Sequence, residues 1–244
     1  MNTERYSLTI IIPVYNEEDN MLALEQRFSA FLPTCRVPAC VLFVNDGSKD
    51  RSGELIREVC SRHEDFFYLS FARNAGLSAA IKAGFDAAGS EFVGYIDADL
   101  QTAPEDFNLL LDAIADHSMA IGIRAKRNDS FSKRFQSRFA NGFRRMMTGD
   151  DAVDTGCPLK IIRSDVAKRI PMFKGMHRFF PALVMLQEGA SYVQIPVRHF
   201  PRTAGVSKFS MWNRLLGPLM DCFAYRWMKT RYINYNIEES NINK

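Results

Sequence analysis

The stretch Phe92-Val93-Gly94-Tyr95-Ile96-Asp97-Ala98-Asp99-Leu100-Gln101 is a short apolar run that ends in two carboxylates and an amide. The apolar part is too short for a helix and rich in β-branched and aromatic residues, which predicts a buried strand of a parallel sheet. Residues two apart in an extended chain point the same way, so Asp97 and Asp99 are expected to face one site beyond that strand. Such oxygen ligands suit Mg²⁺ or Mn²⁺, which complete their shells with water and substrate phosphates.

The Asp-Ala-Asp motif also has a simpler interpretation, a polar turn that leads into a helix. Taken alone, the motif does not distinguish this turn from a metal site. An EF-hand loop is excluded, because positions six and twelve counted from Asp97 are Thr102 and Asn108 rather than Gly and Glu. Thr102 and Glu105, with Pro104 between them, predict a capping box that opens the next helix. The acids are therefore expected between a strand end and a helix start.

The composition is that of an ordinary globular protein. The chain has 244 residues, 47% of them hydrophobic and 24% charged, which allows one domain, or one domain with an appendage. We expect neither a signal peptide nor a membrane-spanning segment. Five cysteines without zinc-type spacing are typical of a reduced, cytoplasmic protein. The net charge is only +3, but residues 124–147 hold eight basic residues and one acid.

Strands and helices are predicted to alternate through the first half of the chain, which calls for a mostly parallel sheet flanked by helices. The strands are expected at residues 8–14, 41–44, 67–71 and 92–96. Each strand is followed by a polar, turn-rich stretch, at residues 15–18, 46–50, 73–76 and 97–101. Ligands bind outside the carboxyl ends of such strands, so four polar stretches on one edge predict a site. The sequence contains neither a dinucleotide-binding glycine motif nor a P-loop. A metal ion and side chains would therefore have to neutralise the charge of a phosphate-containing ligand.

The second half is more irregular and more basic. Strands are predicted at residues 119–123, 160–163 and 192–197, and helices at residues 130–148 and 209–232. The first of these helices carries Phe at every fourth position with basic residues between, so it can pack on the core or lie on an anionic membrane. The last helix mixes Trp and Leu with Arg and Lys, which suits a bilayer interface. The small-residue loop from Arg202 to Lys208 has a cation at each end and can close on phosphate.

In the order and spacing of its motifs, the chain resembles the family-2 inverting glycosyltransferases of GT-A fold, above all the dolichol-phosphate mannose synthase-like and polyprenyl-phosphate glycosyltransferases. The motifs are Pro13-Val14-Tyr15-Asn16-Glu17, Asn45-Asp46-Gly47-Ser48, Arg73-Asn74-x-Gly76, Asp97-Ala98-Asp99-Leu100-Gln101, Asp154-x-Gly156-Cys157 and Arg202-x-x-Gly205-x-Ser207-Lys208-Phe209. The resemblance covers about residues 8–212. It implies a GT-A catalytic domain over residues 1–208, followed by an amphipathic helix and a polar tail over residues 209–244.

The resemblance implies how a sugar nucleotide would be held. The residues expected at its nucleoside are Pro13, Tyr15, Glu17 and Asp46, with Arg73 near the base or ribose. The residues expected to hold Mg²⁺ or Mn²⁺ on the diphosphate are Asp97, Asp99 and Gln101. Arg202 and Lys208 would clamp the same diphosphate. A metal and two cations would stabilise the charge that the leaving nucleoside diphosphate gains.

Asp99 and Asp154 are the residues expected to act in catalysis, Asp154 as a general base. Cys157 stands where some relatives have a second acid, which leaves the assignment of the base open. A phosphate monoester, with a second pKa near 6, is already ionised at pH 7 and would need no base. A sugar hydroxyl would need one.

The sequence thus predicts a cytoplasmic enzyme, peripheral on the inner face of the membrane, that transfers a sugar with inversion from a nucleotide sugar to polyprenyl phosphate. Family habit favours a UDP-sugar over a GDP-sugar. Transfer to a saccharide hydroxyl in cell-surface polysaccharide synthesis is the alternative within this class. The alternative outside the enzyme class is a non-catalytic nucleotide-sugar-binding subunit of a membrane complex. The expected partners are a membrane surface or a separate membrane protein, and no nucleic acid.

Overall fold

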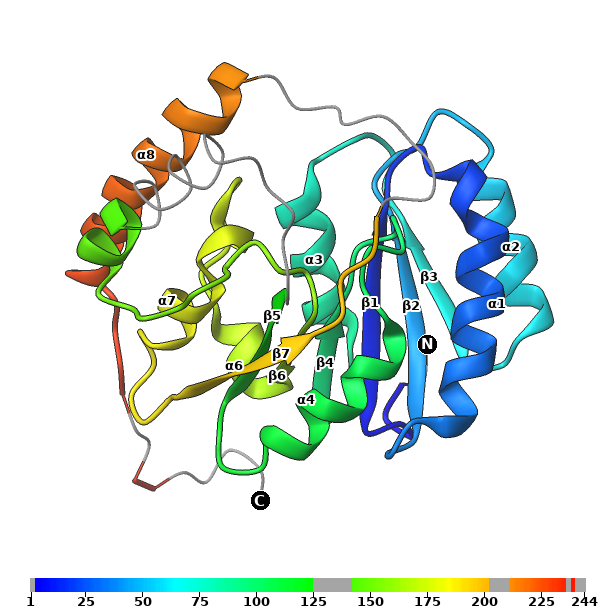
Figure 1. Cartoon of the computed structure of the whole chain (residues 1–244), viewed down its shortest axis with the longest axis horizontal. Helices are drawn as coiled ribbons and strands as arrows, with labels where there is room; N and C mark the ends of the chain where they lie inside the picture. Colours follow the sequence, from blue (N-terminus) through cyan, green and yellow to red (C-terminus); the bar gives the residue numbers. More distant parts are fainter. Residues whose placement is uncertain (1–2, 125–141, 202–210, 236–237, 240–244) are drawn as a thin grey trace.

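The computed structural model describes residues 3–124, 142–201, 211–235 and 238–239. These residues form three layers, in which a seven-stranded sheet lies between two layers of helices (Figure 1). The strand order is β3-β2-β1-β4-β6-β5-β7. Neighbouring strands are parallel except at β6, which is antiparallel to both β4 and β5. The predicted mostly parallel sheet flanked by helices is confirmed.

The strands lie where the apolar runs predicted them. Their bounds are β1 Leu8–Val14, β2 Ala39–Asn45, β3 Phe66–Ser70, β4 Phe92–Tyr95, β5 Met119–Arg124, β6 Lys160–Arg163 and β7 Tyr192–Val197. The strands β1 and β2 lie inside the sheet and are covered on both faces, which is why their sequences are almost continuously apolar.

The helices divide between the two faces of the sheet. The α-helices are α1 Met21–Phe31, α2 Ser52–Arg62, α3 Leu77–Ala87, α4 Phe107–Ala113, α6 Ser164–Arg169, α7 Phe180–Val184 and α8 Met211–Lys229, and residues 142–148 are also helical. The 3₁₀ turns are η1 Glu18–Asn20, η2 Leu32–Thr34, η3 Pro104–Asp106 and η4 Met176–Phe179. The helices α1, α2 and α4 cover one face, and α3, α6, α7 and α8 contribute to the core on the other.

Alternate residues of β1 enter different cores. Ile10 and Ile12 pack with α1 and α2, whereas Ile11 packs with α3. The approach of α3 requires Gly84, because a Cβ there would lie 2.7 Å from Cγ2 of Ile11. The strand β1 is therefore fixed in position from both faces of the sheet, and the loop that follows it begins from a rigid strand.

The C-terminal helix α8 packs on the second core. Among its described side chains, Cys222, Tyr225 and Met228 are buried. The Tyr225 ring stacks on Phe179 with centroids 6.3 Å apart, and its hydroxyl donates to Ala182 O at 3.1 Å. Within the described ranges, no helix is long and apolar enough to cross a membrane. The predicted boundary between residues 208 and 209, and residues 130–141 of the predicted basic helix, lie outside the described residues.

Candidate active site at the carboxyl ends of the strands

The strand order changes direction between β1 and β4. The strands β2 and β3 lie on one side of β1, and β6, β5 and β7 lie beyond β4 (Figure 1). In open α/β sheets, ligands bind at such a switch point, outside the carboxyl ends of the strands. Pairing of Ile11 with Tyr95 places the segments that follow β1 and β4 next to each other there. The polar stretches predicted from the sequence therefore meet on one edge.

The loops after β1 and β2 are joined by hydrogen bonds between backbone and side chains. Asn16 N donates to Ser48 Oγ at 3.0 Å, and Asn16 Oδ1 accepts a hydrogen bond from Lys49 N at 2.8 Å. Glu17 N donates to Ser52 Oγ at 2.9 Å. Asn16 has φ 53°, a left-handed conformation that Asn adopts more readily than most residues. This part of the site has a fixed backbone.

The residues predicted to contact the nucleoside lie on this edge with different exposure. Pro13, Tyr15 and Glu17 are half-buried, whereas Arg73 is exposed. The Glu17 carboxylate accepts a hydrogen bond from Asn20 Nδ2 at 2.7 Å. The structure brings these residues to one end of the sheet, and the assignment of each to the nucleoside stays a prediction.

Asp46, also predicted at the nucleoside, is buried and turned toward the loop after β3. Its carboxylate accepts three hydrogen bonds, from Asn74 Nδ2 at 2.8 Å, Ala75 N at 2.6 Å and Gly76 N at 2.9 Å. The next residue, Gly47, has φ +65°, and a Cβ there would lie 2.4 Å from the carbonyl carbon of Arg73. Asp46 and Gly47 therefore hold the loop that carries Arg73, a relation that the motif alone does not reveal.

Asp97 and Asp99 lie on a turn just beyond β4, and Ala98 between them is buried in the core. The Tyr95 hydroxyl donates to Asp97 Oδ1 at 2.5 Å, and Gln101 N donates to Asp99 Oδ1 at 3.2 Å. Burial raises the pKa of Asp97, and the negative charge of Asp99 adds to the rise, whereas the hydrogen bond from Tyr95 opposes it. The two carboxylates are thus close enough to repel each other, and a shared cation would relieve the repulsion.

The donor set of this turn fits a hard divalent ion. Mg²⁺ in nucleotide enzymes is usually held by one or two carboxylates and completed by water and phosphate oxygens. Over the described ranges, no group of three His, Cys, Asp or Glu side chains converges on one point. Among the described carboxylates, Asp97 and Asp99 would hold the ion, and its further ligands would come from substrate, solvent and Gln101. Gln101, the third predicted ligand, donates its side-chain amide to Phe200 O at 3.4 Å.

Asp97→Asn is expected to raise the unfolding temperature of the metal-free protein. A raised pKa in the folded state means that ionised Asp97 destabilises the fold at pH 7, while Asn keeps the acceptor for Tyr95 without the charge. The difference in unfolding temperature between variant and wild type should be largest above the folded-state pKa of Asp97. It should shrink as the pH falls below that pKa and vanish below the ordinary pKa of an aspartate. Thermal unfolding in chelator across pH, with the exposed Asp116→Asn as control, measures it. An unchanged or lower unfolding temperature at pH 7 would contradict the electrostatic interpretation.

The predicted capping box of Thr102 and Glu105 is not formed. The N-cap of η3 is Ala103, and no side chain caps this turn. Thr102 instead forms an isolated antiparallel bridge with His199, beyond the end of β7. The prediction was wrong because a segment distant in sequence pairs with the backbone at Thr102.

Asp154, the candidate general base, is paired with Arg124 at the end of β5. Arg124 Nε and Nη2 each lie 2.7 Å from a carboxylate oxygen, and Arg124 N donates to the same carboxylate at 3.1 Å. The exposed fractions of the two side chains are only 17% and 10%. The Arg124 guanidinium therefore binds both carboxylate oxygens of Asp154 in a bidentate pair.

Lys160, the first residue of β6, is a site residue that the motifs do not include. It is buried, its ammonium donates to Cys157 O, and Nζ lies 5.5 Å from the centre of the Tyr95 ring. Burial lowers the pKa of Lys160, and its charge in turn favours the ionised form of Asp97. The signal in the sequence is a cation at the head of the apolar run Leu159-Lys160-Ile161-Ile162.

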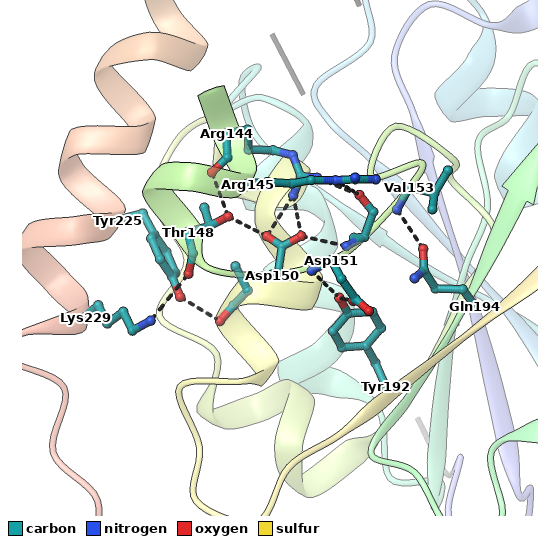
Figure 2. Close-up of polar contacts among 12 residues, drawn as sticks. Arg144, Arg145, Thr148, Asp150, Asp151, Val153, Tyr192, Gln194, Tyr225 and Lys229 are labelled. Atoms are coloured by element: carbon teal, nitrogen blue, oxygen red, sulfur yellow. Dashed lines mark hydrogen bonds and ion pairs between the residues drawn. The ribbon is translucent and has the colours of Figure 1, made fainter. Parts of the chain in front are cut away.

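Residues 150–154 connect the Arg124–Asp154 pair to a second, more deeply buried ion pair. The second pair, Arg144 with Asp150, is shown in Figure 2. Arg144, on helix 142–148, lies 2.7 Å from Asp150, and their side chains are 8% and 1% exposed. Asp150 accepts further hydrogen bonds from a threonine hydroxyl at 2.6 Å and a backbone N–H at 2.9 Å. The segment that ends at the candidate base is therefore anchored at both ends by Arg–carboxylate pairs.

The sequence profile described as Glycosyl transferase family 2 matches residues 9–170. The chain belongs to this family. Among its family-2 relatives are the undecaprenyl-phosphate 4-deoxy-4-formamido-L-arabinose transferases of Edwardsiella ictaluri and Pseudomonas fluorescens. The first is 34% identical over 88% of this chain and 67% of the relative, and the second is 33% identical over 88% and 64%. The chain spans about two thirds of the length of these relatives.

Solved structures share the fold of this family-2 chain. Mannosyl-3-phosphoglycerate synthase from Rubrobacter xylanophilus matches with a TM-score of 0.69 and 14% identity, over 93% of this chain and 76% of that one. A mannosyltransferase from Pyrobaculum calidifontis in complex with GDP-Man and Mn²⁺ matches at 0.64 and 16%, over 90% and 64%. Glucosyl-3-phosphoglycerate synthase from Mycobacterium tuberculosis, in complex with Mn²⁺, UDP and glucosyl-3-phosphoglycerate, matches at 0.65 and 11%, over 93% and 81%. The GT-A fold predicted from the sequence is confirmed.

Proposed function

We propose that this family-2 glycosyltransferase moves a sugar from a nucleotide sugar to polyprenyl phosphate, with inversion at the anomeric carbon. One observation carries the proposal: the Asp97–Asp99 pair stands at the switch point of a chain about a third identical to undecaprenyl-phosphate sugar transferases. A UDP-sugar is the proposed donor, although solved neighbours with this fold hold either UDP or GDP-Man. A non-catalytic subunit is the proposed alternative if no sugar is transferred.

The proposed metal ligands are Asp97 and Asp99, with Gln101 as a third. When bound at this turn, Mg²⁺ or Mn²⁺ would supply positive charge that stabilises the leaving diphosphate. The solved neighbours that contain Mn²⁺ together with GDP-Man or UDP support this choice of ion. Arg202 and Lys208 are proposed to bind the same diphosphate, and both lie outside the described residues.

The proposed nucleoside-binding residues come from the loops after the first three strands. Pro13, Tyr15 and Glu17 stand in the rigid loop after β1, and Arg73 in the loop after β3. Asp46 contributes by holding the loop that carries Arg73, because its carboxylate accepts three hydrogen bonds from residues 74–76. The donor would thus be held by backbone that the fold has already ordered.

The proposed reaction forms one bond and breaks one bond at the anomeric carbon. A phosphate oxygen of the acceptor attacks opposite the nucleoside diphosphate, and the electron pair of the broken C–O bond leaves with the diphosphate. No proton needs to be removed, because the acceptor phosphate is largely ionised at pH 7. With this acceptor, the proposed role of Asp154 is to fix the position of Arg124 through two hydrogen bonds. Asp154 would act as a general base only with a hydroxyl acceptor.

The function is tested with UDP- and GDP-sugars, Mn²⁺ and undecaprenyl phosphate in detergent. The expected product is a sugar-phospholipid, with an anomeric configuration opposite to that of the donor by NMR. A product with saccharide acceptors and none with undecaprenyl phosphate would support the alternative acceptor. Donor binding without transfer to either acceptor and without slow hydrolysis would identify a binding subunit.

The exposed face of α8 is proposed to contact an anionic membrane surface, on the cytoplasmic side. It carries the apolar side chains of Leu219, Met220, Phe223 and Trp227, which are 39% to 65% exposed. Arg231 lies over the Trp227 ring at 4.9 Å, and Arg226 and Lys229 are exposed on the same helix. Aromatic and basic side chains together favour the interface of a bilayer, where each cation contributes about 1 kcal/mol.

The double variant Phe223→Ala, Trp227→Ala is expected to bind phosphatidylglycerol vesicles at least about tenfold more weakly, since each ring buries apolar surface worth about 1.5–3 kcal/mol. Co-sedimentation at low and high salt measures the binding, and neutral vesicles show the charge dependence. Leu22→Ala on α1 is the matched control, because Leu22 is equally exposed on a different surface. Protein that stays in the supernatant at low salt would instead indicate that α8 docks on a protein partner.

A further inference from the structure

The turn that carries the proposed metal ligands contains a residue in an unfavourable backbone conformation. Leu100, between Asp99 and Gln101, has φ 57°, and within the described ranges only one other non-glycine residue has a positive φ. The left-handed region is disfavoured about 5- to 30-fold for a residue with a side chain. Such a conformation persists only where neighbouring structure holds it.

The segment that follows β7 lies along this turn. Phe200 N donates to Gln101 O at 2.8 Å, and Gln101 Nε2 donates back to Phe200 O at 3.4 Å. Thr102 and His199 form an antiparallel bridge. The two residues directly after the strained one are therefore tied to a second stretch of backbone.

Asp106, at the end of η3, anchors that second stretch. Arg198 N donates to Asp106 Oδ2 at 2.7 Å, and Arg198 Nε donates to Asp106 Oδ1 at 2.8 Å. Arg198 Nη2 also lies 2.6 Å from Oδ1. Asp106 is only 2% exposed. A buried carboxylate that binds both the backbone and the guanidinium of one residue fixes where the chain runs next.

We propose that Asp106 and Arg198 are positioning residues for the metal site. They hold residues 198–200 against the turn, and this contact keeps Leu100 in the conformation in which Asp99 faces the ion. The inference rests on the proposed metal-dependent function, and it assigns a task to two residues that touch neither ion nor substrate. Asp106 and Arg198 thus order the turn at residues 97–101 before any ligand binds.

The test measures Mn²⁺ binding to the full chain without donor, from the electron paramagnetic resonance signal of free Mn²⁺. Asp106→Asn is expected to bind Mn²⁺ about 5- to 30-fold more weakly, the factor by which the left-handed conformation is disfavoured. Glu105→Gln is the matched control, because Glu105 also pairs with Arg198, at 3.5 Å, but is exposed. Its Mn²⁺ affinity should stay within about twofold of wild type.

A rescue experiment separates positioning from general stability. In the Asp106→Asn background, Leu100→Gly should bind Mn²⁺ about fivefold more tightly than Leu100→Ala. Both substitutions remove the Leu100 side chain beyond Cβ, but only glycine enters the left-handed region freely. Equal binding by the two double variants would overturn the proposal, because a purely structural role of Asp106 predicts no difference.

The failures of the two proposals are distinguishable. Wild-type protein that binds no Mn²⁺ would overturn the metal site and this inference with it. Wild-type protein that binds Mn²⁺, together with Asp106→Asn that binds it equally well, would overturn only the positioning role. If Asp106→Asn does not fold, Arg198→Gln keeps the backbone bond to Asp106 and loses the guanidinium contacts. It should weaken Mn²⁺ binding in the same direction, and unchanged binding would overturn the proposal.

Discussion

Asp99→Asn is expected to lower the rate of sugar transfer about 100- to 1000-fold, by analogy with loss of one charged or hydrogen-bonding group that stabilises a transition state. The side chain stands on a turn beyond β4, outside the packed core, so its replacement should leave the fold intact. Initial rates at saturating donor and Mn²⁺ give the loss of activity. Thermal unfolding in chelator shows whether the variant is folded.

Asp112→Asn is a suitable control for this experiment. Asp112 is an exposed carboxylate on α4 that pairs with Arg36 at 2.9 Å, away from the switch point. Its loss should change the rate little, because an exposed pair contributes only about 0–1 kcal/mol. Full activity of the wild-type enzyme in excess chelator would contradict the role assigned to Asp99.

Asp150→Ala is expected to destabilise the protein by about 3–5 kcal/mol and to lower its unfolding temperature by about 6–20 °C. The substitution leaves the Arg144 guanidinium buried without its counter-charge, and it removes the acceptor of two further hydrogen bonds (Figure 2). Thermal and denaturant unfolding measure the effect. Helix 142–148 and residues 150–154 should both lose protection in hydrogen exchange.

Asp151→Ala is the matched control, one residue further along the chain. Asp151 is exposed and accepts a hydrogen bond from the Tyr192 hydroxyl, so its loss should cost about 1 kcal/mol. The double variant Arg144→Met, Asp150→Leu should be more stable than Asp150→Ala, because it leaves no unpaired buried charge. If Asp150→Ala and Asp151→Ala prove equally stable, the buried pair does not anchor this segment.

The parts of the fold that depend on local sequence could be predicted. The bounds of β1, β6 and β7 agree with the predicted strands, because each is an apolar or alternating run with clear polar or turn boundaries. The alternation of strands and helices then implied a parallel sheet. The polar stretches after the strands implied a ligand site at the edge formed by the carboxyl ends of the strands. The Asp97–Asp99 turn was found for the same reason, since strand end and carboxylates are adjacent in sequence.

The parts that depend on distant contacts could not be predicted. Asp106 and Arg198 lie 92 residues apart, and nothing near either one indicates the other. The reversed direction of β6, the burial of Lys160 and the turning of Asp46 toward residues 74–76 likewise follow from tertiary packing. The predicted capping box was wrong for the same reason, because Thr102 pairs with the chain beyond β7 rather than capping the turn that follows it.

The position of β4 in the sheet has a consequence for synthesis on the ribosome. Its two partners are β1, made before it, and β6, which begins roughly 65 residues later. At about 5–20 residues per second, the second edge of β4 stays unpaired for about 3–13 s after the strand has emerged. An unpaired, apolar edge is a template for pairing with another chain. Slow codons between residues 96 and 159 would lengthen this interval and favour aggregation of the nascent protein over folding.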